Sequence, residues 1–178
     1  QLDEYEYVWS LDTDAFIIGP ITYDVFGLMA AHNASYGYVD VNVETAEVAH
    51  GLGECIADFL RKRRRRGKIP PMMLDRYRRG PNARWDGSKF YTNFQVARVT
   101  FGRSDEYRAL FEHVDRSGGI YLHRWGADPF MFVAVTLLLQ PEKVVHFNDI
   151  PYLHQHLLAN LPSEVAPNLT LEAIGSPS

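Results

Sequence analysis

Residues 5–14, which read YEYVWSLDTD, decide how the rest of the sequence is interpreted. The aromatic-rich run through Leu11 predicts a strand that ends in Asp12-Thr13-Asp14. Side chains two positions apart on an extended chain share a face, so the two carboxylates are expected to converge. Paired carboxylates hold hard divalent cations and leave positions open for phosphate oxygens. The pattern indicates a metal site for a diphosphate leaving group, although Asp-x-Asp at a strand end more often forms a turn or a helix cap.

The composition bounds the class of protein. The chain has 178 residues with 46% hydrophobic content, which suits one globular domain with a sizeable core. No apolar run approaches the ~18 residues of a membrane-spanning helix, and the longest one, residues 130–139, predicts a buried helix. Cys55 is the only cysteine, which excludes an internal disulfide and a cysteine-rich zinc site. The sequons at Asn33 and Asn168 are compatible with a secretory compartment.

Charge is distributed very unevenly along the sequence. Residues 1–60 contain eleven Asp or Glu and no Lys or Arg, whereas residues 61–89 contain twelve Lys or Arg and two Asp. The core of the basic block is residues 61–66, RKRRRR. This block could contact a polyanion, a membrane surface or a partner. Alternatively, it is simply a solvated helix end, where cations also interact favourably with the helix dipole. In either case we expect it to face solvent or a partner. Nucleic acid is not expected, because no aromatic residues interleave with the arginines.

Strand and helix patterns alternate along the chain and predict an α/β fold. Strands are expected at residues 5–11, 36–43, 90–101 and 144–147, and helices at residues 23–32, 44–66, 104–117 and 128–139. Thr22 is the expected N-cap of the first helix and Ser104 that of the third. Residues 67–88 are rich in Pro, Gly and Arg and predict a long loop. Residues 1–161 are therefore assigned to one domain and residues 162–178 to a loosely ordered tail.

Several stretches together resemble the fungal α-1,2-mannosyltransferase family, which contains glycolipid and glycoprotein 2-alpha-mannosyltransferases. The first is residues 5–14, which look like that family's Tyr-Glu-Tyr-x-Trp-Arg-x-Glu-Pro-Asp segment. The others follow in the same order and with similar spacing, namely ITYDVF at 21–26, TNFQVAR at 92–98, FGRS at 101–104, SGG at 117–119, RWG at 124–126 and HFNDIPYLH at 146–154. No single match is decisive, but the ordered set is specific.

The resemblance implies a GT-A-type fold, a GDP-mannose donor, a manganese ion and retaining transfer to a mannose hydroxyl of a glycan in the Golgi lumen. By position, Asp12 and Asp14 would form the diphosphate–metal motif, and His154 falls where the family places its metal-binding histidine. An imidazole ligand suits manganese better than magnesium. Without the resemblance, His154 would be read as an ordinary loop histidine. Arg124 and Trp125 would line the sugar pocket, with core packing the equally weighted alternative for Trp125.

The sequence departs from the family pattern at three points. Gln95 occupies the position of the proposed carboxylate nucleophile, and an amide cannot form a glycosyl-enzyme intermediate. The acid of the family's Gly-Asp-Ala-Pro is displaced by one position to Asp128, which would either act in the pocket or cap the helix that follows it. The nucleotide-binding half that precedes the Tyr-Glu-Tyr segment in the family has no counterpart here, so we expect a trimmed N-terminus or a separate chain that carries that half.

The best interpretation is the C-terminal half of a metal-dependent mannosyltransferase domain, with Gln95 and Asp128 at the reacting centre. A non-enzymatic alternative is a divergent pseudo-transferase that acts as a binding or assembly subunit, which Gln95 and the missing half favour. A polyanion-binding module built on residues 61–66 would rest on composition alone.

Overall fold

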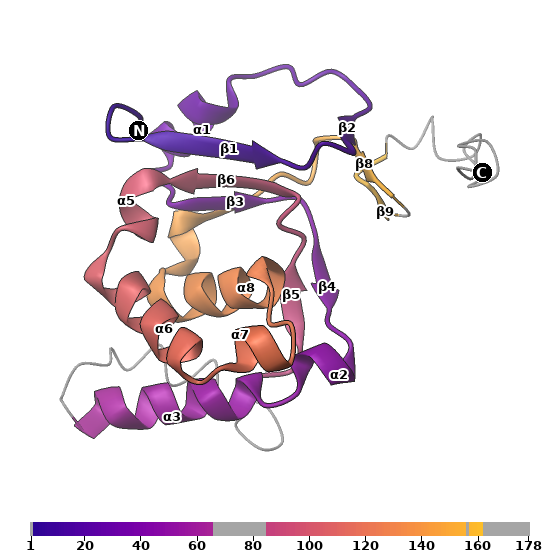
Figure 1. Ribbon diagram of the computed structural model, residues 1–178. Coiled ribbons are helices and arrows are strands. Elements are labelled where there is room, and N and C mark those ends of the chain that lie inside the picture. The colour runs from indigo at the N-terminus through magenta and orange to yellow at the C-terminus, as the bar shows by residue number, and fades with distance from the viewer. Residues whose placement is uncertain (1, 66–84, 156, 162–178) are drawn as a thin grey trace.

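The computed structural model describes residues 2–65, 85–155 and 157–161 (Figure 1). The strands are β1 Tyr7–Leu11, β2 Ala15–Ile17, β3 Tyr36–Tyr38, β4 Val41–Val43, β5 Ser88–Phe90, β6 Phe94–Arg98, β7 Val144–His146, β8 Tyr152–His154 and β9 Leu157–Ala159. The helices are α1 Val25–Ala31, α2 Ala46–Ala49, α3 Leu52–Arg65, α5 Val99–Gly102, α6 Asp105–Arg116, α7 Gly119–Leu122 and α8 Ala127–Leu138, with a 3-10 turn at Pro141–Lys143. Within these residues, every helix is too short or too polar to cross a bilayer.

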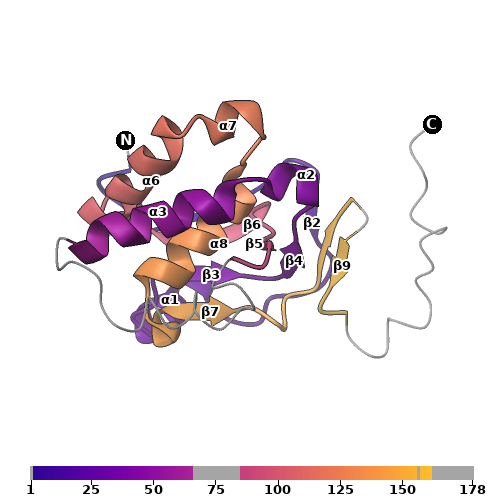
Figure 2. The same ribbon diagram turned by 90° about the horizontal axis from the view of Figure 1, so that it is seen from below.

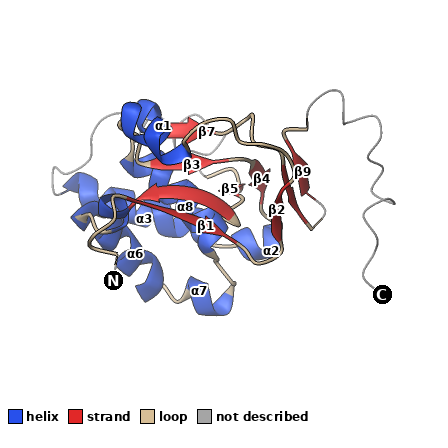
Figure 3. Ribbon diagram, turned by 90° about the horizontal axis from the view of Figure 1, so that it is seen from above, coloured by secondary structure: helices blue, strands red, loops and turns tan. Residues whose placement is uncertain are grey.

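A four-stranded sheet in the order β1-β6-β3-β7 forms the centre of the molecule (Figure 3). Strand β6 runs antiparallel to both of its neighbours, whereas β3 and β7 are parallel. Two smaller antiparallel sheets flank it, one made of β2, β8 and β9 and the other of β4 and β5. The mixed sheet with helices on both sides confirms the predicted α/β fold.

The core consists of two hydrophobic clusters on opposite faces of the central sheet. Helix α1 lies on one face, and α3, α6 and α8 lie on the other (Figures 1 and 2). Phe94 and Val96 belong to the cluster beside α1, while Tyr36 belongs to the cluster beside α8. Because side chains alternate along a strand, Gln95 faces away from Phe94 and Val96, and it meets the Tyr36 hydroxyl on the α8 side.

The structure corrects several predicted boundaries. The helix expected at residues 44–66 is broken into α2 and α3 at Gly51, whose φ of 79° lies in the left-handed region that favours glycine. The strand expected at 36–43 divides into β3 and β4, which join different sheets. The single strand expected at residues 90–101 is likewise divided, among the end of β5, the whole of β6 and most of the short helix α5. Asp24, and not Thr22, caps α1 by accepting a hydrogen bond from the Phe26 amide.

Other predictions are confirmed or fall outside the described part of the chain. Ser104 caps α6 by accepting a hydrogen bond from the Tyr107 amide, as expected. Most of the predicted loop, at residues 66–84, and the predicted tail, at residues 162–178, lie outside the described residues.

Candidate metal centre

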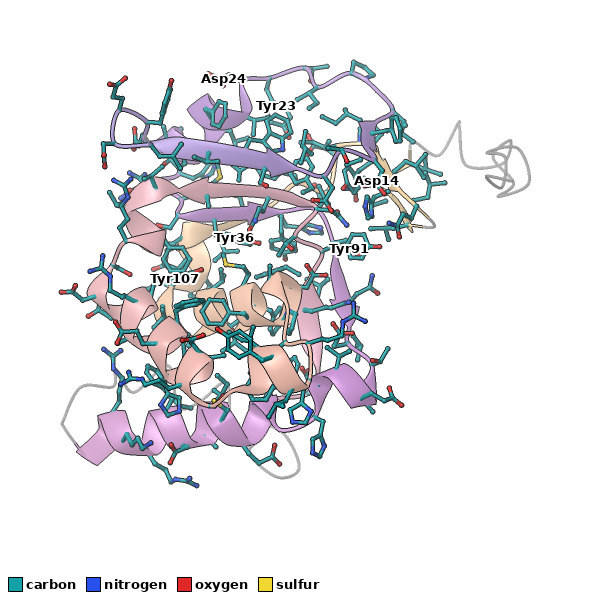
Figure 4. All side chains as sticks on the ribbon, in the orientation of Figure 1. Asp14, Tyr23, Asp24, Tyr36, Tyr91 and Tyr107 are labelled. Carbon is teal, nitrogen blue, oxygen red and sulfur yellow. The ribbon has the colours of Figure 1, made fainter. Side chains whose placement is uncertain are left out.

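The turn between β1 and β2 carries Asp12 and Asp14 at one end of the central sheet (Figure 4). The turn is closed by a hydrogen bond from the Ala15 amide to the Asp12 carbonyl, and the Asp12 amide donates to the Asn93 carbonyl. Strand β2 then pairs with β8 so that Ala15 lies opposite His154. This register brings the imidazole, which is 140 residues further along the chain than Asp14, beside the two carboxylates.

The three side chains converge at one place, and His154 is within hydrogen-bonding distance of Asp14. His154 Nε2 lies 3.0 Å from Asp14 Oδ1 and 3.7 Å from Asp12 Oδ2. One potential ligand atom from each residue lies within 4.8 Å of the others. The carboxylates are open to solvent, with 58% and 54% of their side-chain surface exposed, whereas the His154 side chain is 7% exposed. The sequence expectation that these residues share one place in the fold is therefore met.

The contacts of Asp14 favour its ionised form. The Gln155 amide donates to Asp14 Oδ2 at 3.1 Å. This hydrogen bond, with a smaller contribution from His154, holds the pKa of the Asp14 carboxyl below its ordinary value. An ionised carboxylate pair and an imidazole form a mixed oxygen and nitrogen donor set, which suits Mn²⁺ and other first-row divalent cations. The chemistry of the donors thus fits the metal that the sequence implies.

The far side of the His154 ring is held by a buried polar pair. Asn93 Nδ2 lies 2.9 Å from His154 Nδ1, and the Tyr152 hydroxyl donates to Asn93 Oδ1 at 2.5 Å. Asn93 is 7% exposed and Tyr152 is fully buried. Tyr91 adds an edge-to-face contact with the His154 ring, at 5.5 Å between centroids. Sequence reasoning assigned no role to Asn93 or Tyr152, because neither contact is visible before the strands pair.

Gln95 and Asp128 are each fixed by a specific partner. Gln95 Oε1 accepts a hydrogen bond from the Tyr36 hydroxyl at 3.2 Å. Asp128 lies in the first turn of α8, where the N-cap position belongs to Gly126 and no side chain caps the helix. Asp128 instead accepts hydrogen bonds from the backbone amide and the hydroxyl of Thr92. Asp128 therefore does not cap α8, and its carboxylate binds Thr92 instead.

Asp128 is also connected to a partly buried ion pair. Lys89 Nζ lies 3.1 Å from Glu44 Oε2 and 3.7 Å from Asp128 Oδ2. The partner of Asp128, Thr92, immediately precedes Asn93, which contacts His154. The β5–β6 connection therefore holds both the acid at the start of α8 and the imidazole of His154.

Arg124 and Trp125 make their contacts elsewhere. Arg124 is exposed and has a φ of 58°. Trp125 is 5% exposed, its indole N–H donates to the His50 carbonyl at 3.0 Å, and its ring stacks on His123. Trp125 belongs to the hydrophobic cluster around α8. Within the described residues, no hydrogen bond or ring contact joins Arg124 or Trp125 to the candidate metal triad, Asp12, Asp14 and His154.

The described part of the basic block lies on the surface of α3. The Arg61 and Lys62 side chains are 69% and 62% exposed, and both pair with Asp58 one turn earlier. These two cations therefore face solvent, as expected; residue 66 and the side chains of residues 64 and 65 lie outside the described part. A hollow of about 800 Å³ between α3 and α6 adjoins them, lined in part by Asp58 and His113.

Comparison with known proteins places the chain in a family. The family model of glycolipid 2-alpha-mannosyltransferases matches residues 1–166, and the chain belongs to this family. Glycolipid 2-alpha-mannosyltransferase 1 of Candida albicans is 30% identical over 153 residues, covering 86% of this chain and 35% of the relative. The glycolipid 2-alpha-mannosyltransferase of Saccharomyces cerevisiae is 31% identical over 160 residues, covering 86% and 34%.

Solved structures confirm the fold. Core-mannan synthase A of Aspergillus fumigatus in its Mn/GDP form superposes with a TM-score of 0.79 at 27% identity, covering 91% of this chain and 45% of that chain. The mannosyltransferase Ktr4p of S. cerevisiae in complex with GDP gives 0.78 at 25% identity, covering 92% and 44%. The chain therefore has the GT-A-type fold of these transferases, and it spans less than half the length of the relatives that it matches.

Proposed function

We propose that this chain contributes the metal-binding part of a retaining mannosyltransferase that moves mannose from GDP-mannose to a mannose hydroxyl of a glycan. The observation that carries the proposal is the convergence of Asp12, Asp14 and His154 at the end of β1. Similarity to a transferase solved in a Mn/GDP form supports the same conclusion. Similarity to glycolipid 2-alpha-mannosyltransferases and the two sequons favour the Golgi lumen as the compartment.

In this proposal Asp12, Asp14 and His154 hold a manganese ion. When bound, the ion would supply positive charge to the diphosphate leaving group. The two carboxylates are exposed, so the solvent side of the site is open to a ligand, while the buried His154 would hold the ion from the side of the protein interior. The hydrogen bond from Gln155 lowers the pKa of the Asp14 carboxyl and so favours the ionised form, which binds a cation.

Gln95 is assigned a hydrogen-bonding role toward the transferred sugar. Its oxygen is taken by the Tyr36 hydroxyl, and among the described residues its amide N–H groups have no acceptor. Gln95 can therefore donate to a sugar or phosphate oxygen but cannot form a covalent glycosyl intermediate. Transfer on one face of the sugar, with the leaving phosphate as base, is the chemistry compatible with this residue. The Asp128 carboxylate, fixed by Thr92, would accept a hydrogen bond from an acceptor hydroxyl.

A second candidate function is a pseudo-transferase that binds or assembles without turnover. The specific observation that favours it is the amide of Gln95 at the position where the family's carboxylate is expected. In both cases the partners are a nucleotide sugar, a glycan and a polypeptide that carries the remainder of the transferase domain.

The test is transfer of labelled mannose from GDP-mannose to a mannose acceptor with Mn²⁺, comparing Gln95→Ala with Asp14→Ala. Gln95→Ala is expected to slow transfer by the equivalent of about 1–3 kcal/mol, the cost of one hydrogen bond to a charged group. Asp14→Ala is expected to be far more damaging, because the leaving group loses its counter-charge. Equal losses in both variants would contradict the assigned roles. Mn²⁺ binding without any turnover by the wild-type chain, assayed together with a polypeptide that carries the remainder of the transferase domain, would favour the pseudo-transferase.

A further inference from the structure

We propose that Asn93 and Tyr152 form an outer shell of the metal centre, and that their hydrogen bonds reverse direction when His154 binds a cation. The inference rests on the proposed metal site and assigns positioning roles to two residues that do not themselves touch the ion. It starts from the way in which the His154 ring is held on the side that faces the protein interior.

The hydrogen bonds around the ring define one tautomer. Asn93 Nδ2 carries two protons and accepts none, so His154 Nδ1, 2.9 Å away, acts as the acceptor. The Asn93 oxygen accepts a hydrogen bond from the Tyr152 hydroxyl at 2.5 Å, which is the contact expected for this orientation of the amide. In the neutral ring the proton must then lie on Nε2, where it is donated to Asp14 Oδ1 at 3.0 Å. A continuous series of hydrogen bonds thus runs from Tyr152 through Asn93 and His154 to Asp14.

Metal binding requires the opposite arrangement. A cation held between His154 and the carboxylates needs the lone pair of Nε2, since Nε2 is the ring nitrogen that faces Asp12 and Asp14. The ring proton must then lie on Nδ1, which becomes a donor. Asn93 can accept that proton only by turning its amide so that Oδ1 faces the ring. The Nε2 proton is released to solvent and solvent supplies the proton that Nδ1 gains, so the ring remains neutral and there is no net change in bound protons.

The two residue types suit such a reversal. An amide presents an acceptor and a donor group of nearly the same shape, so it can turn over without repacking its neighbours. Once it has turned, Nδ2 faces Tyr152, whose hydroxyl can accept as readily as it donates. Asn93 is 7% exposed and Tyr152 0% exposed, so water does not readily take over either contact. Phe94 packs on the Tyr152 ring at 5.5 Å and holds the hydroxyl in place.

The first experiment measures Mn²⁺ binding by the 178-residue chain, using electron paramagnetic resonance of the free ion. Asn93→Ala is expected to weaken binding by about 10- to 100-fold, the usual effect of losing an outer-shell partner. Tyr152→Phe is expected to weaken it by less, because the amide remains. Asn160→Gly is the matched control: it removes another structural amide, which donates to the Phe147 and Ile150 carbonyls, and it suits the φ of 56° at that position. The control is expected to bind Mn²⁺ like the wild type.

The second experiment needs no variant and therefore does not depend on whether a substituted chain folds. Nitrogen-15 NMR of the wild-type histidine rings reports the tautomer of His154 without metal and with diamagnetic Zn²⁺. The expected result is a proton on Nε2 without metal and on Nδ1 with Zn²⁺, together with a shift of the Asn93 side-chain amide signals.

The outcomes separate this inference from the proposed function. A wild-type chain that binds no Mn²⁺ overturns the metal site and the outer shell together. Mn²⁺ bound equally well by the wild type and by folded Asn93→Ala overturns only the positioning role of Asn93. An unchanged tautomer in the presence of Zn²⁺ overturns the reversal.

Discussion

Replacing Trp125 with alanine is expected to lower the free energy of unfolding by about 3–5 kcal/mol, the usual cost of truncating a buried aromatic residue. The indole is 5% exposed, lies in the cluster around α8, and donates a hydrogen bond to the His50 carbonyl at 3.0 Å. The hydrogen bond contributes on the order of 1 kcal/mol of this loss, and the rest comes from lost packing. Because Trp125 has no contact with the metal triad among the described residues, Mn²⁺ affinity of the folded variant is expected to be unchanged.

The assay is urea unfolding followed by circular dichroism, with thermal unfolding as a second probe. In a chain of this size each kcal/mol shifts the midpoint by roughly 2–4 °C, so the midpoint should fall by roughly 6–20 °C. Leu122→Ala is the control, because Leu122 lies nearby in the sequence but is 77% exposed and should change stability by less than about 0.5 kcal/mol. The packing role would be refuted if Trp125→Ala lowered the free energy of unfolding by less than about 1 kcal/mol, or if the folded variant clearly lost Mn²⁺ or sugar binding. Either result would favour the alternative in which Trp125 lines the sugar pocket.

Two further predictions concern stability. Gly37→Ala would drive a methyl group into the ring of Phe147, so we expect the free energy of unfolding to fall by about 1–3 kcal/mol in urea unfolding. Gly102→Ala in α5 is the control, because the added methyl group meets nothing within 4 Å and should leave stability unchanged or slightly higher. Similar losses in both variants would contradict this prediction. Burial and the hydrogen bond to Asp149 raise the pKa of Tyr23 to about 12 from a usual value of 10.0, so its stabilising contribution is present below pH 10 and is lost as the pH rises toward 12. Tyr23→Phe is expected to reduce the wild-type loss of stability in that window, and parallel pH profiles would count against the assignment.

The metal triad illustrates what could be predicted from the sequence. The strand that ends in Asp12 and the shared face of Asp12 and Asp14 follow from side-chain alternation, which is a local property. His154 is 140 residues away from Asp14, and no local pattern connects them. Only its position within a segment similar to the family pointed to it, and the pairing of β2 with β8 is what brings it to the site.

The outer contacts of the site could not have been predicted because they depend on tertiary pairing. Asn93 lies in the short connection between β5 and β6, and its role appears only when β8 places Tyr152 and His154 on either side of its amide. Asp128 had the position of a helix cap in the sequence, yet its carboxylate is used by Thr92, which arrives from the same connection. The break of the expected helix at Gly51 depends on a backbone conformation that residue identity alone does not settle.

The most direct test of the central claim is a Mn²⁺ titration of the wild-type chain and of Asp14→Asn, an isosteric variant that removes one negative charge from the site. One Mn²⁺ is expected to bind per wild-type chain. Asp14→Asn and His154→Ala, each with wild-type circular dichroism, are expected to take up none over the concentration range in which the wild type saturates. Absence of binding by the wild type, or saturation of the variants at the same concentration, would contradict a metal centre formed by Asp12, Asp14 and His154.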